Sequence, residues 1–181
     1  MAKRIFIYGG LSGLVIIISI LIGLASGNKA ASSEFVGYLI MVIALAIIFV
    51  GIKRHRDLDL GGVIRFLPAF GMGLGIAAVA SLIYVVVWEI YLASTGYVFI
   101  EQYAATVIEQ MRSSGASTAE IEKMGSDMAS MAKSYANPLF RTAITFTEIF
   151  PVGFIVALVS AAILRNPRVL PRHAPAAVRP D

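Results

Sequence analysis

Four long apolar segments dominate the pattern of hydrophobic and polar positions along the chain. They cover about residues 5–25, 35–52, 68–92 and 139–164. A helix rises about 1.5 Å per residue, so segments of this length can cross a hydrocarbon core of about 30 Å. The pattern predicts an all-α polytopic membrane protein with four transmembrane helices, in a transmembrane domain over residues 1–165.

The stretch between the third and fourth apolar segments has a different pattern. Over about 97–135, apolar residues recur three or four positions apart in two runs, which is typical of amphipathic helices. Ser117 and Glu120 have the spacing of a capping box at the start of the second run. We expect a two-helix hairpin on the extracytoplasmic side of the membrane. The apolar positions are Ile100, Ala104, Val107, Ile108 and Met111, then Ile121, Met124, Met128, Met131 and Tyr135.

Glycine and proline residues mark where the predicted helices begin, end or bend. Gly61 and Gly62 are expected to break the helix before the third segment, and Pro68 suits the first turn of that segment. Pro151 predicts a kink in the fourth helix. Residues 166–181 contain four prolines and are predicted to be a disordered cytoplasmic tail.

The first apolar segment allows two interpretations. Lys3 and Arg4 precede it, and small residues at 25–27 offer a cleavage point, as in a signal peptide. Its length exceeds the usual signal core, and small residues recur four positions apart in two runs, which favours close packing of a retained helix. These small residues are Gly9, Gly13, Ser19, Gly23 and Gly27.

The composition supports a membrane protein and narrows the chemistry. The chain is 58% hydrophobic and 14% charged, whereas soluble domains are about half apolar and a quarter charged. It has no cysteine, which excludes disulfides and thiolate metal sites. His55 and His173 lie in polar segments, so haem ligation within the membrane lacks its usual ligand. We expect no cofactor and no metal site.

Basic residues gather at the ends of the apolar segments, and this predicts the orientation. Positive loops stay in the cytoplasm, so both termini are expected to be cytoplasmic, in a bacterial inner membrane. The net charge of +4 then reflects topology. A nucleic-acid partner is not expected, because the basic residues lack interleaved aromatic residues. The basic residues are Lys3, Arg4, Lys53, Arg54, Arg56, Arg65, Arg165, Arg168, Arg172 and Arg179.

Lys53, Arg54 and Arg56 form a basic cytoplasmic loop between the second and third segments. The simpler interpretation is that this loop only sets the orientation of the protein in the membrane; the alternative is that it contacts anionic lipid headgroups. Asp57 and Asp59 are expected to pair with neighbouring arginines or to cap the next helix.

Three charged residues within the apolar segments are the candidate site. Glu89 and Glu148 lie towards the same end of the third and fourth helices, and Arg141 precedes Glu148 by two helical turns, so it could pair with either carboxylate. Acidic residues in membrane segments count as functional hypotheses. The alternatives are a polar pocket that binds a cation, proton or polar headgroup, and a structural clamp between the two helices.

A methionine stripe on the second hairpin helix raises copper binding, because thioether sulfur suits Cu(I). Met124, Met128 and Met131 also occupy the apolar positions of that helix, where methionine is a good gap filler. We favour packing over metal binding.

Two stretches of the chain resemble a known family. Residues 51–57 with Gly61-Gly62, and the stretch from Asn137 through Thr145, Glu148 and Pro151 to Leu164, resemble a bacterial membrane-protein family described as domain of unknown function 4199. The resemblance covers nearly the whole chain except the tail. It implies the architecture above and carries no assigned reaction.

Two function hypotheses follow. The first is a non-enzymatic accessory, scaffold or envelope component of the membrane. The alternative is a small transporter or ion-conducting protein that uses Glu89 and Glu148, and a homo-oligomer would be needed because four helices enclose little space. A membrane enzyme ranks third, because no histidine that could act as a general base lies in the spans.

Overall fold

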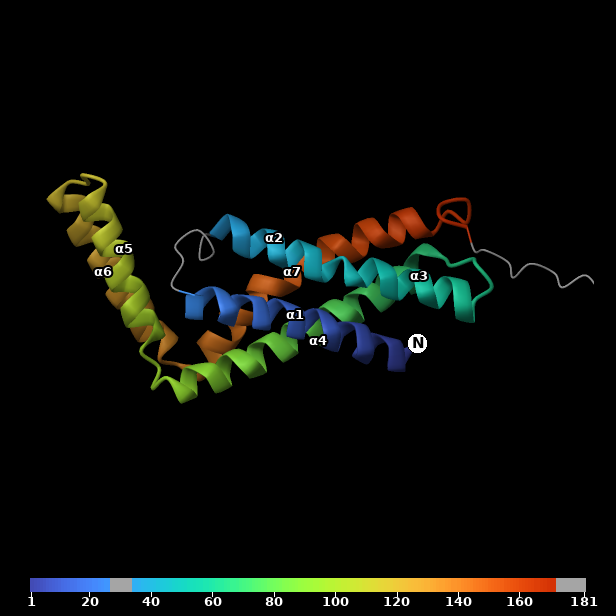
Figure 1. The fold of residues 1–181 in the computed structure, drawn as a ribbon, viewed down its shortest axis with the longest axis horizontal. Coiled ribbons are helices and arrows are strands. Elements are labelled where there is room, and N and C mark those ends of the chain that lie inside the picture. The colour runs from blue at the N-terminus through green and yellow to red at the C-terminus, as the bar shows by residue number, and fades with distance from the viewer. Residues whose placement is uncertain (27–33, 172–181) are drawn as a thin grey trace, which may run out of the picture. The chain divides into compact units, whose positions relative to one another are not determined.

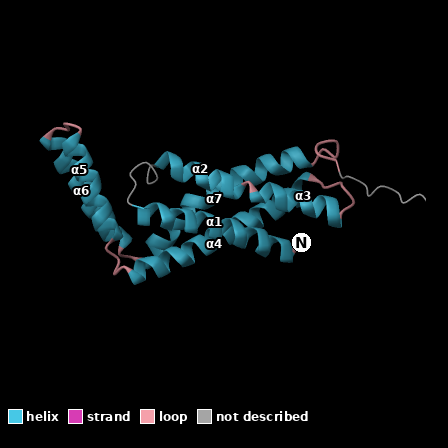
Figure 2. Ribbon diagram, in the orientation of Figure 1, coloured by secondary structure: helices cyan, strands magenta, loops and turns pink. Residues whose placement is uncertain are grey.

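The computed structural model describes residues 1–26 and 34–171, and these residues form seven helices and no strands (Figures 1 and 2). They divide into two compact units. The bundle unit comprises Met1–Tyr84 and Ile149–Asp181, and the hairpin unit comprises Val85–Glu148. The helices are α1 (Ala2–Ser26), α2 (Glu34–Leu45), α3 (Ile47–Asp59), α4 (Phe66–Ser94), α5 (Phe99–Ser113), α6 (Thr118–Tyr135) and α7 (Pro138–Leu164).

Four helical stretches of the described chain are long and apolar enough to cross a membrane, which confirms the all-α class with four candidate spans. The second stretch joins α2 and α3 across Ala46. There the Ala46 amide donates to the Ile43 carbonyl and the Phe49 amide donates to the Ala46 carbonyl, and both bonds have the three-residue spacing of a tighter helical turn. The candidate spans are Ala2–Ala25, Phe35–Asp59, Phe66–Ser94 and Pro138–Leu164.

The prediction of a basic loop at Lys53, Arg54 and Arg56 is wrong. These residues lie on α3, which continues to Asp59. Charged pairs four residues apart along the helix offset the cost of extending it beyond the apolar segment. Lys53 pairs with Asp57, and His55 Nδ1 lies 2.7 Å from Asp59 Oδ2.

The predicted helix break is confirmed after Asp59. Gly61 and Gly62 have φ values of 70° and 99°, a region that residues with a Cβ rarely adopt. Pro68 lies in the first turn of α4, as expected, and Pro151 lies inside α7. The predicted kink at Pro151 stays a prediction. The small residue Gly27 of the first segment and most of the tail, 172–181, lie outside the described residues.

Close backbone contacts hold the bundle unit together around α4. A Cβ added to Gly73 would lie 2.7 Å from the Cβ of Ala157 on α7, and one added to Gly153 would lie 2.7 Å from the Cβ of Ala77. Helix α1 also approaches α4 closely: a Cβ at Gly13 of α1 would lie 2.7 Å from the Ala80 carbonyl oxygen. Such positions require glycine, because helices in lipid associate through close packing of small residues.

This packing makes Gly71 and Gly73, near the start of α4, unequal in their tolerance of a side chain. Gly73→Ala is expected to lower the free energy of unfolding by about 1–3 kcal/mol, because its methyl group would overlap Ala157. Gly71→Ala should be neutral or slightly stabilising, because nothing lies within 4 Å of a Cβ there. Denaturant titration in mixed micelles measures both; equal stabilities would contradict the packing described.

Candidate functional site

The C-terminal end of α4 closes in a Schellman turn, which positions one aromatic residue of the site. The Gly96 amide donates to the Ala93 carbonyl at 3.4 Å, and the Tyr97 amide donates to the Leu92 carbonyl at 2.8 Å. Gly96 has a φ of 69°, and Tyr97 has a φ of 58°, which is costly for a residue with a Cβ. The turn holds Tyr97 in a strained conformation directly before α5.

A bidentate ion pair joins the end of α4 to the start of α7. Arg141 donates from Nε to Glu89 Oε1 and from Nη2 to Glu89 Oε2, both at 2.7 Å. The Arg141 side chain is 6% exposed and that of Glu89 is 27% exposed. Bidentate, charge-assisted hydrogen bonds of this kind fix orientation as well as distance. The structure thus pairs Arg141 with Glu89, one of the two carboxylates expected for it.

Arg141 also holds the end of α6. Its Nη1 donates to the backbone carbonyl of Tyr135 at 3.0 Å. The guanidinium carbon lies 4.8 Å from the centre of the Tyr97 ring and 5.8 Å from that of Tyr135, within the range of cation–π attraction. One buried arginine therefore contacts α4, the α4–α5 connection, α6 and its own helix α7.

Aromatic residues surround this ion pair. The Trp88 indole Nε1 donates to the Tyr135 hydroxyl at 2.8 Å, and the Trp88 ring meets Phe99 edge to face. Burial raises the pKa of the Tyr135 hydroxyl, and the negative charge of Glu148 acts in the same direction. Glu148 lies at an exposed position of α7 close enough to influence Tyr135. Trp88 and Tyr91 suit the interfacial anchor role expected of aromatic residues at span ends.

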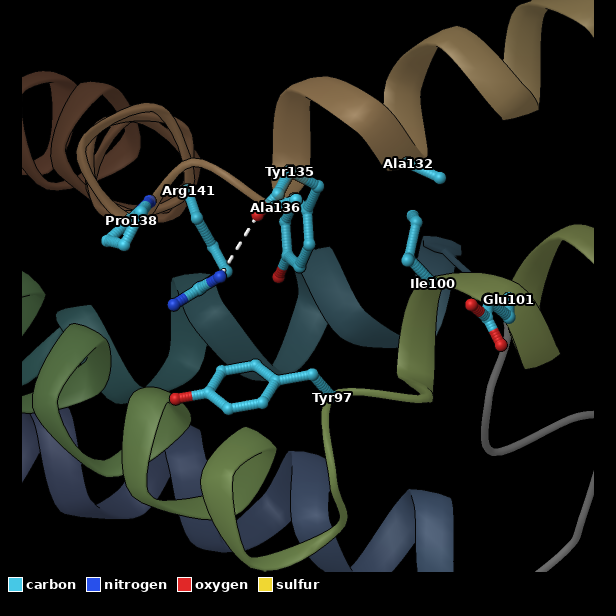
Figure 3. Close-up of a pocket in the computed structure, with 8 residues that line it drawn as sticks. All are labelled: Tyr97, Ile100, Glu101, Ala132, Tyr135, Ala136, Pro138 and Arg141. Atoms are coloured by element: carbon cyan, nitrogen blue, oxygen red, sulfur yellow. Dashed lines mark hydrogen bonds between the residues drawn. The ribbon is translucent and has the colours of Figure 1, made fainter.

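A cavity of about 340 Å³ opens next to Arg141, within the hairpin unit (Figure 3). Arg141 and Glu101 lie towards opposite ends of the cavity; the Tyr97 ring lies against the Arg141 guanidinium, and Tyr135 lies between the two charged residues (Figure 3). The lining residues are Tyr97, Ile100, Glu101, Ala132, Tyr135, Ala136, Pro138 and Arg141.

The helical pair α5 and α6 has the predicted form. Ser117 and Glu120 make the predicted capping box, with the Ser117 amide donating to Glu120 Oε2 at 2.8 Å. These bonds from Ser117 lower the pKa of the Glu120 carboxyl. Neither helix contains a buried residue, so the apolar stripes of both, the methionine stripe included, are only partly covered.

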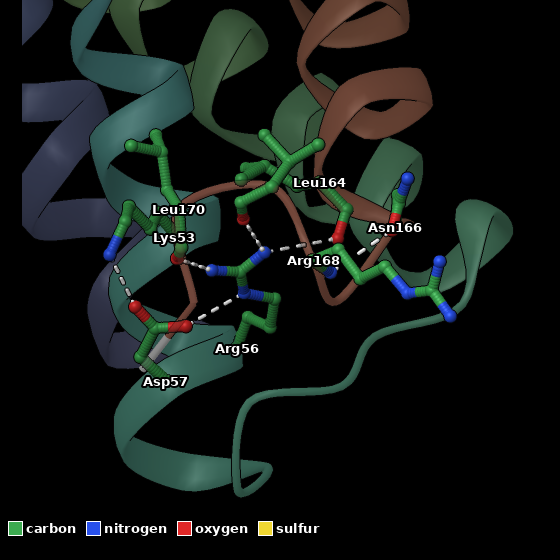
Figure 4. Close-up of polar contacts among 8 residues, drawn as sticks. Lys53, Arg56, Asp57, Leu164, Asn166, Arg168 and Leu170 are labelled. Carbon is green, nitrogen blue, oxygen red and sulfur yellow. Dashed lines mark hydrogen bonds and ion pairs between the residues drawn. The ribbon is translucent and has the colours of Figure 1, made fainter. Parts of the chain in front are cut away.

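In the bundle unit, the predicted basic cluster separates into buried and exposed members. Figure 4 shows Arg56 with its partners Asp57, Leu164 and Leu170. Arg56 is fully buried: Nε donates to Asp57 at 2.7 Å, and its terminal nitrogens donate to the carbonyls of Leu164, Val169 and Leu170. Only Arg54 of the three predicted residues is exposed. The start of the tail predicted to be disordered, residues 166–170, contains turns and bends, and Arg56 binds the carbonyls of Val169 and Leu170 within it.

Sequence reasoning missed Tyr97 and Tyr135 as contacts of Arg141, and it missed Glu101 as a residue of the cavity. One signal was available for Tyr97, because a glycine shortly after an apolar run, here Gly96, marks a helix C-terminus and so positions the next residue. The predicted pairing of Asp57 with a neighbouring arginine is confirmed at Arg56. The carbonyl contacts of Arg56 left no signal, because they join residues more than 100 positions apart.

The fold and the charged site define a helical protein with four candidate membrane spans. A family model described as "Protein of unknown function (DUF4199)" matches residues 7–166, and the chain belongs to this family. This confirms the resemblance seen in the sequence, and the family has no assigned activity. No curated protein and no solved structure matches the chain.

Removing the Glu89 charge tests the ion pair. Glu89→Gln is expected to lower the free energy of unfolding by about 1.5–3 kcal/mol, because it leaves a buried Arg141 without its charged acceptor. Denaturant titration in mixed micelles measures the change. Glu109→Gln is the matched control: its pair with Arg112 is 3.8 Å long and exposed, so stability should change by less than about 0.5 kcal/mol. A smaller effect at position 89 than at position 109 would contradict a stabilising clamp.

Proposed function

We propose that this chain is a non-enzymatic scaffold or accessory protein of the bacterial inner membrane. In this proposal, four helices cross the membrane, both ends face the cytoplasm, and α5 with α6 forms an extracytoplasmic surface for an envelope partner. The observation that carries the proposal is the α5–α6 pair itself: two amphipathic helices that contain no buried residue. A solvent-exposed helical pair with partly covered apolar stripes is suited to contact another macromolecule.

The ion pair supports a scaffold because it makes the ends of the hairpin rigid. Arg141 bonds to Glu89 on α4 and to the Tyr135 carbonyl on α6, so the chain that enters α5 and the chain that leaves α6 are both fixed. A rigid surface loses less conformational entropy when it binds. Both carboxylate oxygens of Glu89 accept hydrogen bonds from Arg141, and this argues against Glu89 as a site where ions bind and exchange.

Contacts at the basic ends of the helices support the proposed orientation. Arg4 at the start of α1 donates to Asp59 at the end of α3 through two bonds of 2.7 Å. Arg56 of α3 bonds to the last carbonyl of α7, Leu164. The N-terminal end of α1 and the C-terminal ends of α3 and α7 therefore share one end of the bundle unit, and Arg54 is exposed there as a contact for anionic lipid headgroups.

The orientation can be tested with single cysteines, because the natural chain has none. Ser126→Cys on α6 and Arg54→Cys on α3 replace exposed side chains. An impermeant maleimide applied to intact spheroplasts should label position 126 at once and position 54 only after the membrane is permeabilised. The reverse order would place the hairpin in the cytoplasm.

Proteoliposomes separate a scaffold from the competing proposal, a small oligomeric transporter. Under an imposed potassium diffusion potential, the wild-type protein is expected to give no more proton entry than protein-free liposomes, measured with an enclosed pH-sensitive dye. Proton entry that is present in the wild type and lost in both Glu89→Gln and Glu148→Gln, with the protein still folded, would make transport the function and reject the scaffold.

A further inference from the structure

We propose that the cavity beside Arg141 binds a phosphoethanolamine group, the headgroup of a zwitterionic membrane phospholipid. The cavity is lined by residues of one unit and lies beside the last residues before α5 and the first residues of α7. This inference goes beyond the scaffold role and does not depend on it or on which side of the membrane the hairpin faces.

Arg141 retains hydrogen-bond donors for a ligand. A guanidinium carries five N–H donors, and the bonds to Glu89 and Tyr135 use three of them. One N–H on Nη1 and one on Nη2 remain, and Arg141 lines the cavity. Arginine N–H groups are well matched to phosphate oxygens. The Arg141 end of the cavity can therefore hold the phosphodiester.

The charges around the cavity favour a zwitterionic ligand. Glu89 already neutralises Arg141, and Glu101 adds a further negative charge at the other end of the cavity (Figure 3). A lone anion would meet the Glu101 carboxylate while the charge of Arg141 is already neutralised, and a lone cation would meet the guanidinium. A zwitterion with its phosphate near Arg141 and its ammonium near Glu101 satisfies both ends. A primary ammonium fits better than a quaternary one, because it donates hydrogen bonds to a carboxylate.

The size and position of the cavity suit a lipid headgroup. A volume of about 340 Å³ lies near the lower end of the range for small-molecule sites, about 300–1,000 Å³. It holds a headgroup and leaves acyl chains outside. Pro138 lines the cavity and begins the fourth candidate span, while Tyr97 follows closely after the third span ends at Ser94. Tyrosine at the ends of spans lies at the depth of lipid headgroups.

The strained backbone of Tyr97 is an independent observation. Its φ of 58° would cost less with glycine or asparagine, so the turn alone does not require a tyrosine. Strain of this kind persists at ligand sites where the side chain is needed. Here it holds the Tyr97 ring against Arg141 and makes it a wall of the cavity.

Native mass spectrometry of the full chain in detergent tests the site. Phosphatidylethanolamine, phosphatidylglycerol and phosphatidylcholine with identical acyl chains are titrated separately. The wild type should bind phosphatidylethanolamine about tenfold more tightly than the other two lipids. Glu101→Gln should remove that preference, a loss of about 1.4 kcal/mol. Glu122→Gln, which removes an exposed carboxylate on α6 away from the cavity, should keep it.

Tyr97→Asn provides a second variant, since asparagine tolerates the left-handed backbone. Its thermal stability should change little, while the preference for phosphatidylethanolamine falls. Competition with soluble glycerophosphoethanolamine distinguishes a free headgroup compound from the intact lipid as the ligand. If this compound displaces phosphatidylethanolamine at a concentration equal to the lipid's own Kd, the ligand is the free compound; if it does not, the ligand is the lipid. Equal binding of the three lipids by the wild type, or an unchanged preference in Glu101→Gln, would overturn the proposal.

Discussion

Helices in hydrocarbon gain nothing from burying apolar side chains against one another, because lipid tails are just as apolar, so their association depends on how closely the backbones approach. In the bundle unit this constraint is met along α4. Gly13 of α1 lies against the Ala80 carbonyl, and Gly73 lies against Ala157. Buried apolar side chains such as Ile16 and Ile76 fill the space between the helices that these contacts bring together. Larger residues at the contact positions would separate the helices on which the core depends.

The same medium makes charge and unpaired polar groups costly, and the described residues answer this consistently. No buried side-chain nitrogen or oxygen among them lacks a hydrogen-bond partner. Arg56, which is fully buried, bonds to a carboxylate and to carbonyls at a helix C-terminus, where positive charge is favoured. Arg141 bonds to a carboxylate and to the last carbonyl of α6. Among the described residues, each unit thus contains one buried arginine that joins segments distant in sequence.

The sequence alone predicts the features that depend on neighbouring residues. Segment length predicts the four candidate spans, and the Ser117–Glu120 spacing predicts the start of α6. Charge counting missed the extension of α3 to Asp59, because it treats each charge alone, whereas the helix pairs Lys53 with Asp57. The choice of Glu89 over Glu148 as the partner of Arg141 depends on how α4 and α7 are rotated, which hydropathy does not report.

The buried contacts of Arg56 impose an order on assembly during synthesis. Its carbonyl partners lie 108 to 114 residues further along the chain. At about 5–20 residues per second, the ribosome needs on the order of ten seconds to supply them. Through that interval the guanidinium has to be hydrated at the membrane surface, and it is enclosed only when α7 is complete. The closing contact of the bundle unit is therefore also one of its last, so a nascent chain stopped before residue 164 would still expose a charge that the finished protein buries.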